Sequence, residues 1–355
     1  MHEGHDQEKL KEIKVIVRKE DEGKILMRLV KEAMEAQGIP QSWNQARELC
    51  RSGRVFVDGE EMLDAFFAPT PGSHLQIRLN APKRRHGILH PSEIVYVDDD
   101  VLVVNKRAGI LTLPFDEGDR DTLLDQIRAY FLAKLRAQKP QKRHLDVQIG
   151  VVHRLDKETS GLLVFARNHR AKLSLDEQIR SHSVERRYLA IAHGVVHDAV
   201  HQSHILADVG DGFRGSWGSR PWHKGPPPPD AKWSHTEVRW LERFGQKATL
   251  VECRLRTGRQ HQIRIHLSEA GHPLIGEKVY VRGHLGPLIE APRVMLHARL
   301  LGFEHPRTGR WMEFELEAPG DFRRTIESLR AEAGSFLREK PKNKLKANDE
   351  SARPC

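Results

Sequence analysis

The stretch His153-Arg-Leu-Asp-Lys-Glu-Thr-Ser-Gly-Leu-Leu-Val-Phe-Ala166 joins a short polar segment to an apolar run. Its first nine residues show neither helical nor strand periodicity, whereas residues 162–166 are typical of a buried strand. Asp156 lies in the polar segment between two basic residues, Arg154 and Lys157. A polar loop fixed to a buried strand often carries a reactive side chain, but a surface turn with a local ion pair has the same pattern. The loop by itself leaves both interpretations open.

The whole chain has 355 residues and a formal net charge of +9 at pH 7. This length allows two or three domains, and no stretch approaches the roughly 18 apolar residues that a membrane span needs. The polar N-terminus predicts no secretory signal, and three widely spaced cysteines (Cys50, Cys253 and Cys355) favour a reducing cytoplasm. The positive charge favours a polyanionic partner such as nucleic acid, although charged tails would produce the same excess.

Residues 23–80 are expected to form a small domain after a tail, residues 1–22, that contains one short strand at residues 13–17. Apolar residues between positions 25 and 33 have helical spacing. Ser42 is the expected N-cap of a second helix, and Asp58-Gly59 predicts a tight turn between two strands.

The second helix of this domain carries Arg47 and Arg51, and Arg54 follows it. This basic edge can contact phosphates, but it can also be an ordinary solvated helix face. The order of helices, strands and the Asp-Gly turn resembles the small RNA-binding domain first described in a ribosomal small-subunit protein. The resemblance covers roughly residues 24–79 and implies that the three arginines bind RNA. It departs at Leu26, where that family often has an aspartate.

After a basic linker at residues 81–92, a larger domain is expected at residues 93–332, followed by a disordered tail at residues 333–355. Strands are expected at residues 95–97, 101–103, 188–192, 249–255, 295–301 and 311–316. Helices are expected after Asp121, at residues 169–179 and at residues 260–270. The strands and helices follow no regular β-α-β repeat, which favours an α+β fold over a doubly wound sheet.

Residues 208–234 contain three tryptophans, several glycines and four consecutive prolines, so we expect an irregular loop here. The tryptophans, Trp217, Trp222 and Trp233, could stack on unpaired bases or cover the edge of the core.

Two further residues could act with Asp156. Arg264 is expected in the first turn of the helix after Thr257-Gly258, where its guanidinium could hold a carboxylate bidentately, bind a phosphate or be structural. Tyr188 shares a strand face with Ala190 and Ala192, which leaves space for a flat ligand, although a core tyrosine would have the same neighbours.

Several enzyme classes lack their motifs in this sequence. No second carboxylate lies in an equally marked loop, as a glycosidase requires, and no His-Glu-x-x-His metal motif occurs. The P-loop, the dinucleotide fingerprint and the Gly-x-Ser-x-Gly elbow are also missing from the sequence. We therefore predict a reaction without metal or nucleotide cofactor.

Four segments resemble, in order, the motifs of the RluA-type pseudouridine synthases. Residues 153–161 are similar to the central motif, and residues 103–109 to the upstream Asn-Lys-Pro-x-Gly motif, with Arg107 in place of proline. Residues 185–190 resemble the Lys-x-Tyr-x-Ala strand, and residues 256–267 the arginine motif, with Gln260 in place of threonine. Residues 271–276 and 296–298 continue the match, which covers about residues 93–320.

The resemblance implies a catalytic domain built on a mixed, largely antiparallel β-sheet with flanking helices. It also implies isomerisation of specific uridines in structured RNA to pseudouridine, by a base-flipping mechanism that depends on Asp156 as nucleophile or base. Arg264 would pair with Asp156, and Tyr188 would stack on the flipped uracil and could act as a base toward the sugar. Leu296 would lie in the pocket floor, and Arg154 would fill the gap that the flipped nucleotide leaves.

An RNA-binding domain ahead of the catalytic domain is common in family members that modify large-subunit ribosomal RNA. We therefore expect ribosomal RNA as the partner, with transfer RNA as an alternative, and a monomeric cytoplasmic enzyme. Two rival functions remain at this stage: an RNA-binding assembly factor without turnover, and a hydrolase that releases free uracil. The combination of Asp156, Tyr188 and Arg264 argues against the assembly factor, since binding alone does not need all three.

Overall fold

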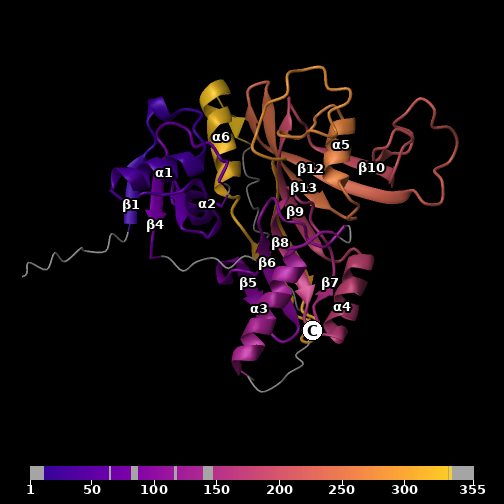
Figure 1. Cartoon of the computed structure of the whole chain (residues 1–355). Coiled ribbons are helices and arrows are strands. Elements are labelled where there is room, and N and C mark those ends of the chain that lie inside the picture. Colours follow the sequence, from indigo (N-terminus) through magenta and orange to yellow (C-terminus); the bar gives the residue numbers. More distant parts are fainter. Residues whose placement is uncertain are drawn as a thin grey trace, which may run out of the picture. The chain divides into compact units, whose positions relative to one another are not determined.

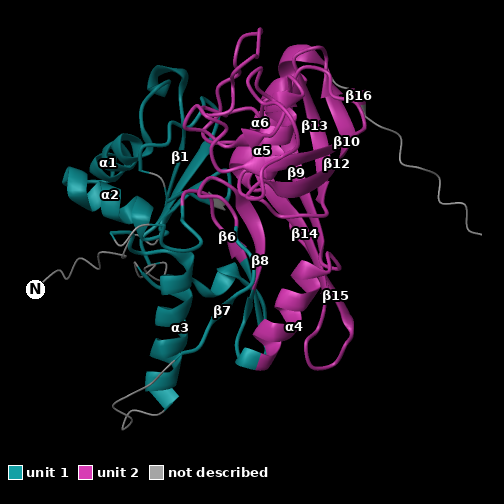
Figure 2. Cartoon of the chain, turned by 90° about the vertical axis from the view of Figure 1, so that its right-hand side faces the viewer, with its two compact units in different colours: residues 1–104, 110–154, 165–169 teal, residues 105–109, 155–164, 170–355 magenta. Residues whose placement is uncertain are grey.

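The computed structural model describes residues 12–63, 65–80, 87–115, 118–138, 147–334 and 336–337. The chain forms two compact units, coloured separately in Figure 2: the first comprises residues 1–104, 110–154 and 165–169, and the second comprises residues 105–109, 155–164 and 170–355. Residues 93–332 therefore contribute to both units. Parts of the expected tails and linker, at residues 1–11, 81–86 and 338–355, lie outside the described residues. None of the helices in the described ranges has the length and apolar composition of a membrane span.

The first unit contains a four-stranded sheet with strand order β1-β4-β2-β3. The elements of this region are β1 (Glu12–Ile16), η1 (Lys19–Asp21), α1 (Leu26–Ala36), α2 (Trp43–Arg51), β2 (Val55–Val57), β3 (Glu60–Glu61) and β4 (His74–Arg78). Ser42 caps α2 as predicted, because its hydroxyl accepts a hydrogen bond from the Gln45 backbone N–H (3.2 Å). Asp58 and Gly59 have φ values of 52° and 82°, and this left-handed pair makes the predicted tight turn.

The first unit also contains the predicted hairpin around Asp98-Asp99-Asp100. Its elements are η2 (Pro91–Glu93), β5 (Ile94–Val97), β6 (Val101–Lys106), α3 (Leu123–Gln138) and β7 (Gly150–Val151). The expected cap of α3 was wrong by one residue. The Thr122 hydroxyl accepts a hydrogen bond from the Asp125 backbone N–H (3.3 Å), whereas Asp121 has a φ of 59° and lies outside the helix.

A larger sheet runs through the second unit in the order β11-β10-β12-β13-β9-β14-β8. Figure 1 labels β10, β12, β13, β9 and β8 of this sheet. Its strands are β8 (Ser160–Ala166), β9 (Glu185–His193), β10 (Ala199–Leu206), β11 (Gly215–Ser216), β12 (Lys232–Phe244), β13 (Ala248–Leu255) and β14 (Leu296–Glu304). Two further strands add to it: β15 (Trp311–Glu315) pairs with β14, and β16 (Phe336–Leu337) pairs with β12. The β14–β8 pair is parallel and the other pairs of this unit are antiparallel. The expected mixed, largely antiparallel sheet is confirmed.

The helices of this part of the chain are α4 (His169–Arg180), α5 (Gln262–Glu269) and α6 (Gly320–Ala333). Helix α6 packs Phe322, Ile326 and Leu329 against one face of the sheet, where they contact Ile191 and Leu250 in a buried cluster. Successive strand residues point to opposite faces, so Tyr188, Ala190 and Ala192 of β9 point away from α6. This opposite face of the sheet carries the candidate site.

The prediction that residues 208–234 contain no regular element was partly wrong. Strand β11 lies inside this segment, and β12 begins at Lys232. The buried positions at the start of β12 are Ser234 and Thr236, so the apolar alternation that normally reveals a strand is missing there.

Candidate active site

Asp156 is the first residue of a tight turn that leads directly into β8. The Asp156 carbonyl accepts a hydrogen bond from the Thr159 backbone N–H (3.1 Å), and the Asp156 side chain is 17% exposed. The second residue of β8 is Gly161, whose φ is +116° and whose added Cβ would lie 2.2 Å from the Ala298 carbonyl oxygen. Only glycine fits this backbone approach, which explains the last residue of the 153–161 segment.

Three donors from other parts of the second unit hold the backbone of this turn. The Lys157 carbonyl accepts hydrogen bonds from the Gly109 backbone N–H (2.8 Å) and from Lys106 Nζ (3.0 Å). The Glu158 carbonyl accepts one from Arg293 Nη1 (3.0 Å). These bonds restrain the backbone that carries the Asp156 carboxylate.

Lys106 is fully buried, and it donates a further hydrogen bond to the Arg107 carbonyl (2.9 Å). Burial lowers the pKa of Lys106 from 10.5 to about 7, although the negative charges of Asp156 and Glu158 oppose this shift. A buried lysine beside the candidate carboxylate therefore titrates near neutral pH.

Arg264 faces Asp156 from the first turn of α5, but its hydrogen bonds go elsewhere. Its Nη1 lies 3.8 Å from Asp156 Oδ2, which is an ion pair without a hydrogen bond. The bidentate partner of Arg264 is Glu277, reached by Nε (2.7 Å) and Nη2 (2.8 Å). The sequence-based picture of an arginine fork on Asp156 therefore needs correction: Glu277 occupies the fork, and only the outer nitrogen is directed at Asp156.

Glu277 is in turn held by the backbone. Its Oε1 accepts hydrogen bonds from the N–H groups of Lys278 (3.0 Å), Val279 (2.9 Å) and Tyr280 (3.3 Å). Burial alone would raise the pKa of Glu277, but the hydrogen bonds and charge of Arg264 outweigh burial and hold this pKa below 4.5. The Arg264–Glu277 pair is thus ionised and fixed in the buried wall of the site.

His261 is a second neighbour of the carboxylate. Its Nε2 lies 3.8 Å from Asp156 Oδ1, and its Nδ1 is 2.7 Å from the Tyr280 hydroxyl. Burial lowers the pKa of His261, against the opposing charge of Asp156, so the ring is mainly neutral at pH 7.

Tyr188 and Leu296 lie on the sheet face that points away from α6. Tyr188 pairs with Ala298 across β9 and β14, and Leu296 pairs with Ala190, so the four side chains share one face. Tyr188 and Leu296 are both buried. Burial raises the pKa of Tyr188 to about 12, against the opposing charge of Arg186, so the phenol is protonated at neutral pH.

Arg154 is exposed and makes no hydrogen bond or ion pair with any described residue. The boundary between the two units falls between Arg154 and Leu155, directly before the Asp156 turn.

The predicted RNA-binding arginines belong to the first unit. Arg47 lies on α2 with its guanidinium 5.3 Å from the Phe66 ring, and Phe66 is itself 54% exposed. Arg51 is exposed in the last turn of α2, and Arg54 is half-buried just before β2. The helix edge therefore presents an arginine and an aromatic ring together.

Sequence reasoning gave no role to Lys106, His261, Glu277, Tyr280 or Arg293. Two of them had a usable signal: Lys106 lies inside the Asn-Lys motif at residues 103–109, and Glu277 directly follows the matched segment 271–276. Their partners could not be read from spacing, because each contact joins segments that are distant along the chain.

Comparison with known proteins places this site in a family. The family model for RNA pseudouridylate synthases matches residues 100–269. The uncharacterized RNA pseudouridine synthase YlyB of Bacillus subtilis is 36% identical over 294 residues, which cover 81% of this chain and 90% of the relative. The ribosomal large subunit pseudouridine synthase D of Pseudomonas aeruginosa is 34% identical over 315 residues, which cover 81% and 87%.

Other relatives match over a smaller share of their length. The Neisseria meningitidis serogroup A protein, also called ribosomal large subunit pseudouridine synthase D, is 36% identical over 254 residues, and the match spans 68% of this chain and 62% of that protein. Among solved structures, human RNA pseudouridylate synthase domain containing 4 has a TM-score of 0.54 at 23% identity, covering 67% of this chain and 93% of the human chain. This likeness supports the fold.

Proposed function

Because the chain belongs to the RNA pseudouridine synthase family, we propose that it isomerises specific uridines of large-subunit ribosomal RNA, with Asp156 as the catalytic carboxylate. The observation that carries this proposal is the fixed Asp156 turn. The turn aims one partly exposed carboxylate at a site lined by Arg264 and His261.

The reaction is an internal exchange of bonds. The bond between uracil N1 and ribose C1′ breaks, the base turns, and a bond forms between uracil C5 and C1′, while C5 loses a proton and N1 gains one. Atoms and electrons balance without a redox partner. A fixed carboxylate can act as nucleophile or base in such a sequence, and Arg264 favours its ionised form.

Tyr188 is proposed to stack on the uracil from the sheet face, with Leu296 beneath it. The protonated phenol is suited to stacking and to donating a hydrogen bond. A role as a base toward the sugar would require loss of a proton with a pKa of about 12, so we favour stacking.

Arg154 is proposed to occupy the gap left in the RNA when the uridine flips out. Flipping a base costs a few kcal/mol, and a side chain inserted in the gap offsets part of that cost. The exposure of Arg154, two residues before the carboxylate, supports this role.

Ribosomal RNA is the preferred substrate because the relatives from Pseudomonas aeruginosa and Neisseria meningitidis are ribosomal large subunit synthases. The edge formed by Arg47, Arg51 and Arg54 would add sequence-independent phosphate contacts. We propose that the enzyme acts as a cytoplasmic monomer.

The test is incubation of the purified chain with a large-subunit ribosomal RNA transcript that carries tritium at uridine C5. We expect tritium release and, after digestion, pseudouridine on nucleoside chromatography. Free uracil would support the hydrolase instead, and neither product would support an RNA-binding factor without turnover. A transfer RNA transcript run in parallel tests the alternative substrate.

A further inference from the structure

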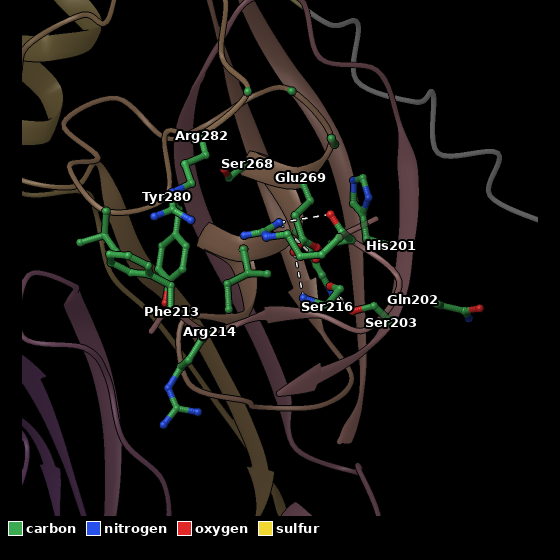
Figure 3. Close-up of a pocket in the computed structure, with 18 of the residues that line it drawn as sticks. His201, Gln202, Ser203, Phe213, Arg214, Ser216, Ser268, Glu269, Tyr280 and Arg282 are labelled. Atoms are coloured by element: carbon green, nitrogen blue, oxygen red, sulfur yellow. Dashed lines mark hydrogen bonds between the residues drawn. The ribbon is translucent and has the colours of Figure 1, made fainter. Parts of the chain in front are cut away.

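A pocket of about 880 Å³ lies beside the C-terminal half of α5. Strand β10, the segment between β10 and β12, and residues 279–283 line it. Figure 3 shows Phe213, Tyr280 and Arg282 on one side of the pocket and His201 and Gln202 on the opposite side. The volume is in the range of sites that hold a small molecule or a nucleotide.

Exposed aromatic rings and arginines line this pocket together. Phe213 is 40% exposed and Trp222 is 57% exposed. The Arg282 guanidinium lies 4.8 Å from the Phe213 ring, and Asp211 pairs with both Arg282 and Arg220. The Trp222 indole is oriented by the hydrogen bond that its Nε1 donates to the Val209 carbonyl (3.1 Å). Rings fixed in this way offer flat surfaces to a base.

The floor of the pocket is polar, and it includes the carboxylate of Glu269, which accepts a hydrogen bond from the Ser216 backbone N–H (2.8 Å). Ser203 Oγ lies 2.9 Å from His266 Nε2 and accepts a hydrogen bond from the Ser216 hydroxyl (2.8 Å). Burial and the neighbouring His201 lower the pKa of His266 to about 4, so the ring is neutral at pH 7. Both ring nitrogens of His266 are paired within the protein, with Ser203 and Ser234 on one side and Thr236 on the other. The Ser216 hydroxyl, which donates to Ser203, can still accept a hydrogen bond from the edge of a base.

The pocket connects with the Asp156 site through Tyr280. This residue lines the pocket, and its hydroxyl contacts His261, whose other ring nitrogen faces Asp156. Arg214 also lines the pocket but makes no hydrogen bond or ion pair with any described residue. Burial raises the pKa of Tyr280 to about 12, and the charge of Arg214 opposes this rise. An arginine that lines the same pocket as Tyr280 and pairs with none of the described carboxylates suits a phosphate group.

We propose that this pocket binds an unpaired nucleotide of the RNA substrate adjacent to the target uridine, with its base against Phe213 and Trp222 and its phosphate on Arg214. The proposal rests on the proposed function, since it needs the target uridine at Asp156. The aromatic surfaces and the floor hydroxyl match a base, and Arg214, which pairs with none of the described carboxylates, matches a phosphate.

The test compares the full-length wild-type chain with Phe213→Leu/Trp222→Leu and with Arg214→Gln. The matched controls are Trp311→Leu and Arg239→Gln, which remove an exposed tryptophan and an exposed arginine outside the pocket. Binding of a fluorescent single-stranded RNA 12-mer is measured by anisotropy, and KM and kcat on the ribosomal RNA transcript by tritium release. We expect each pocket variant to weaken RNA binding and to raise KM by about fivefold or more, while kcat stays unchanged.

The outcomes separate the two proposals. If the wild type is active and the pocket variants bind RNA and turn over like the controls, the proposal for the pocket is overturned. The proposed function is then unaffected. A wild type that makes no pseudouridine overturns both, whatever the RNA binding. Because Arg214 pairs with no residue in the described part of the chain, Arg214→Gln keeps the test valid if the aromatic variants unfold. Photocrosslinking of 4-thiouridine RNA to the 213–222 peptide is the direct supporting result.

Discussion

Arginines in the Asp156 site and on the edge of α2 differ in burial, and from this difference we expect a role in chemistry for the first and in RNA binding for the second. Arg264 is 8% exposed and is fixed by a bidentate pair with the buried Glu277. Arg51 is exposed and makes no ion pair with any described residue. A buried ion pair is little affected by salt and can orient a neighbouring group. Exposed charges are screened by salt, and they suit the binding of a polyanion through many contacts. The predictions below test this division.

The largest effect is expected at the carboxylate itself. Asp156→Asn keeps the size of the side chain and removes its charge, so turnover should fall by about 10³-fold or more while RNA affinity stays within about twofold. Tritium release and anisotropy measure the two quantities. Asp230→Asn, an exposed carboxylate outside the site, is the control. Retained turnover in Asp156→Asn would contradict the assigned role.

The next effect concerns the buried pair. Glu277→Gln leaves the Arg264 charge without its counter-charge, and we expect a loss of about 3 kcal/mol in the free energy of unfolding at pH 7, together with lower kcat. Urea unfolding measures the first quantity, with the exposed Glu290→Gln as control. A loss no larger than that of the control would mean that the pair does not stabilise the site.

Glu277 also gives this prediction a pH dependence. Its folded pKa lies below the ordinary 4.5, so its stabilising contribution is full above about pH 4.5 and is lost as the pH falls toward the folded value. The wild type should therefore lose stability in acid more steeply than Glu277→Gln. Parallel acid unfolding curves for the two proteins would be inconsistent with this sign.

Lys106 should give the folded state a pH dependence at the alkaline side, where stability rises with pH. Its folded pKa of about 7 lies below the 10.5 of the free side chain, so the unfolded chain binds more protons between these values and stability rises with pH. Relative to Lys106→Met, the wild type should gain up to about 1.4 kcal/mol per pH unit between pH 7 and 10. Urea unfolding across this range measures the slope, with Lys232→Met, a substitution at an exposed lysine, as the control.

The smallest effect is expected on the exposed edge. Arg47→Gln/Arg51→Gln should weaken RNA binding a few-fold and reduce the slope of log K against log salt by about 1.5, since two phosphate contacts are lost. Anisotropy titrations at several salt concentrations give the slope. Lys19→Gln, an exposed charge outside α2, is the control. An unchanged slope would remove this edge from the RNA interface.

Local signals explain which parts of the fold could be predicted. Ser42 and the Asp58-Gly59 turn act within a few residues, and both predictions are confirmed. The start of strand β12 was not predicted, because its inward-facing Ser234 and Thr236 form hydrogen bonds with His266 instead of packing against apolar side chains. Alternation of hydrophobicity cannot reveal a strand that buries hydroxyl groups.

The candidate site could be predicted in part for the same reason. Asp156, Tyr188 and Arg264 lie in short motifs, and the structure brings Asp156 and Arg264 within 3.8 Å of each other. Glu277 could not be predicted as the partner of Arg264, because that pairing depends on how residues 271–280 return beside α5. Sequence reasoning could name these candidate residues but not the partners that orient them.

The most direct test of the central claim is a map of pseudouridines in total RNA from cells that contain the wild-type chain, no copy of it, or Asp156→Asn. We predict one or a few positions in large-subunit ribosomal RNA that are modified only with the wild-type chain. Identical maps in all three, or restoration of the missing positions by Asp156→Asn, would contradict the account.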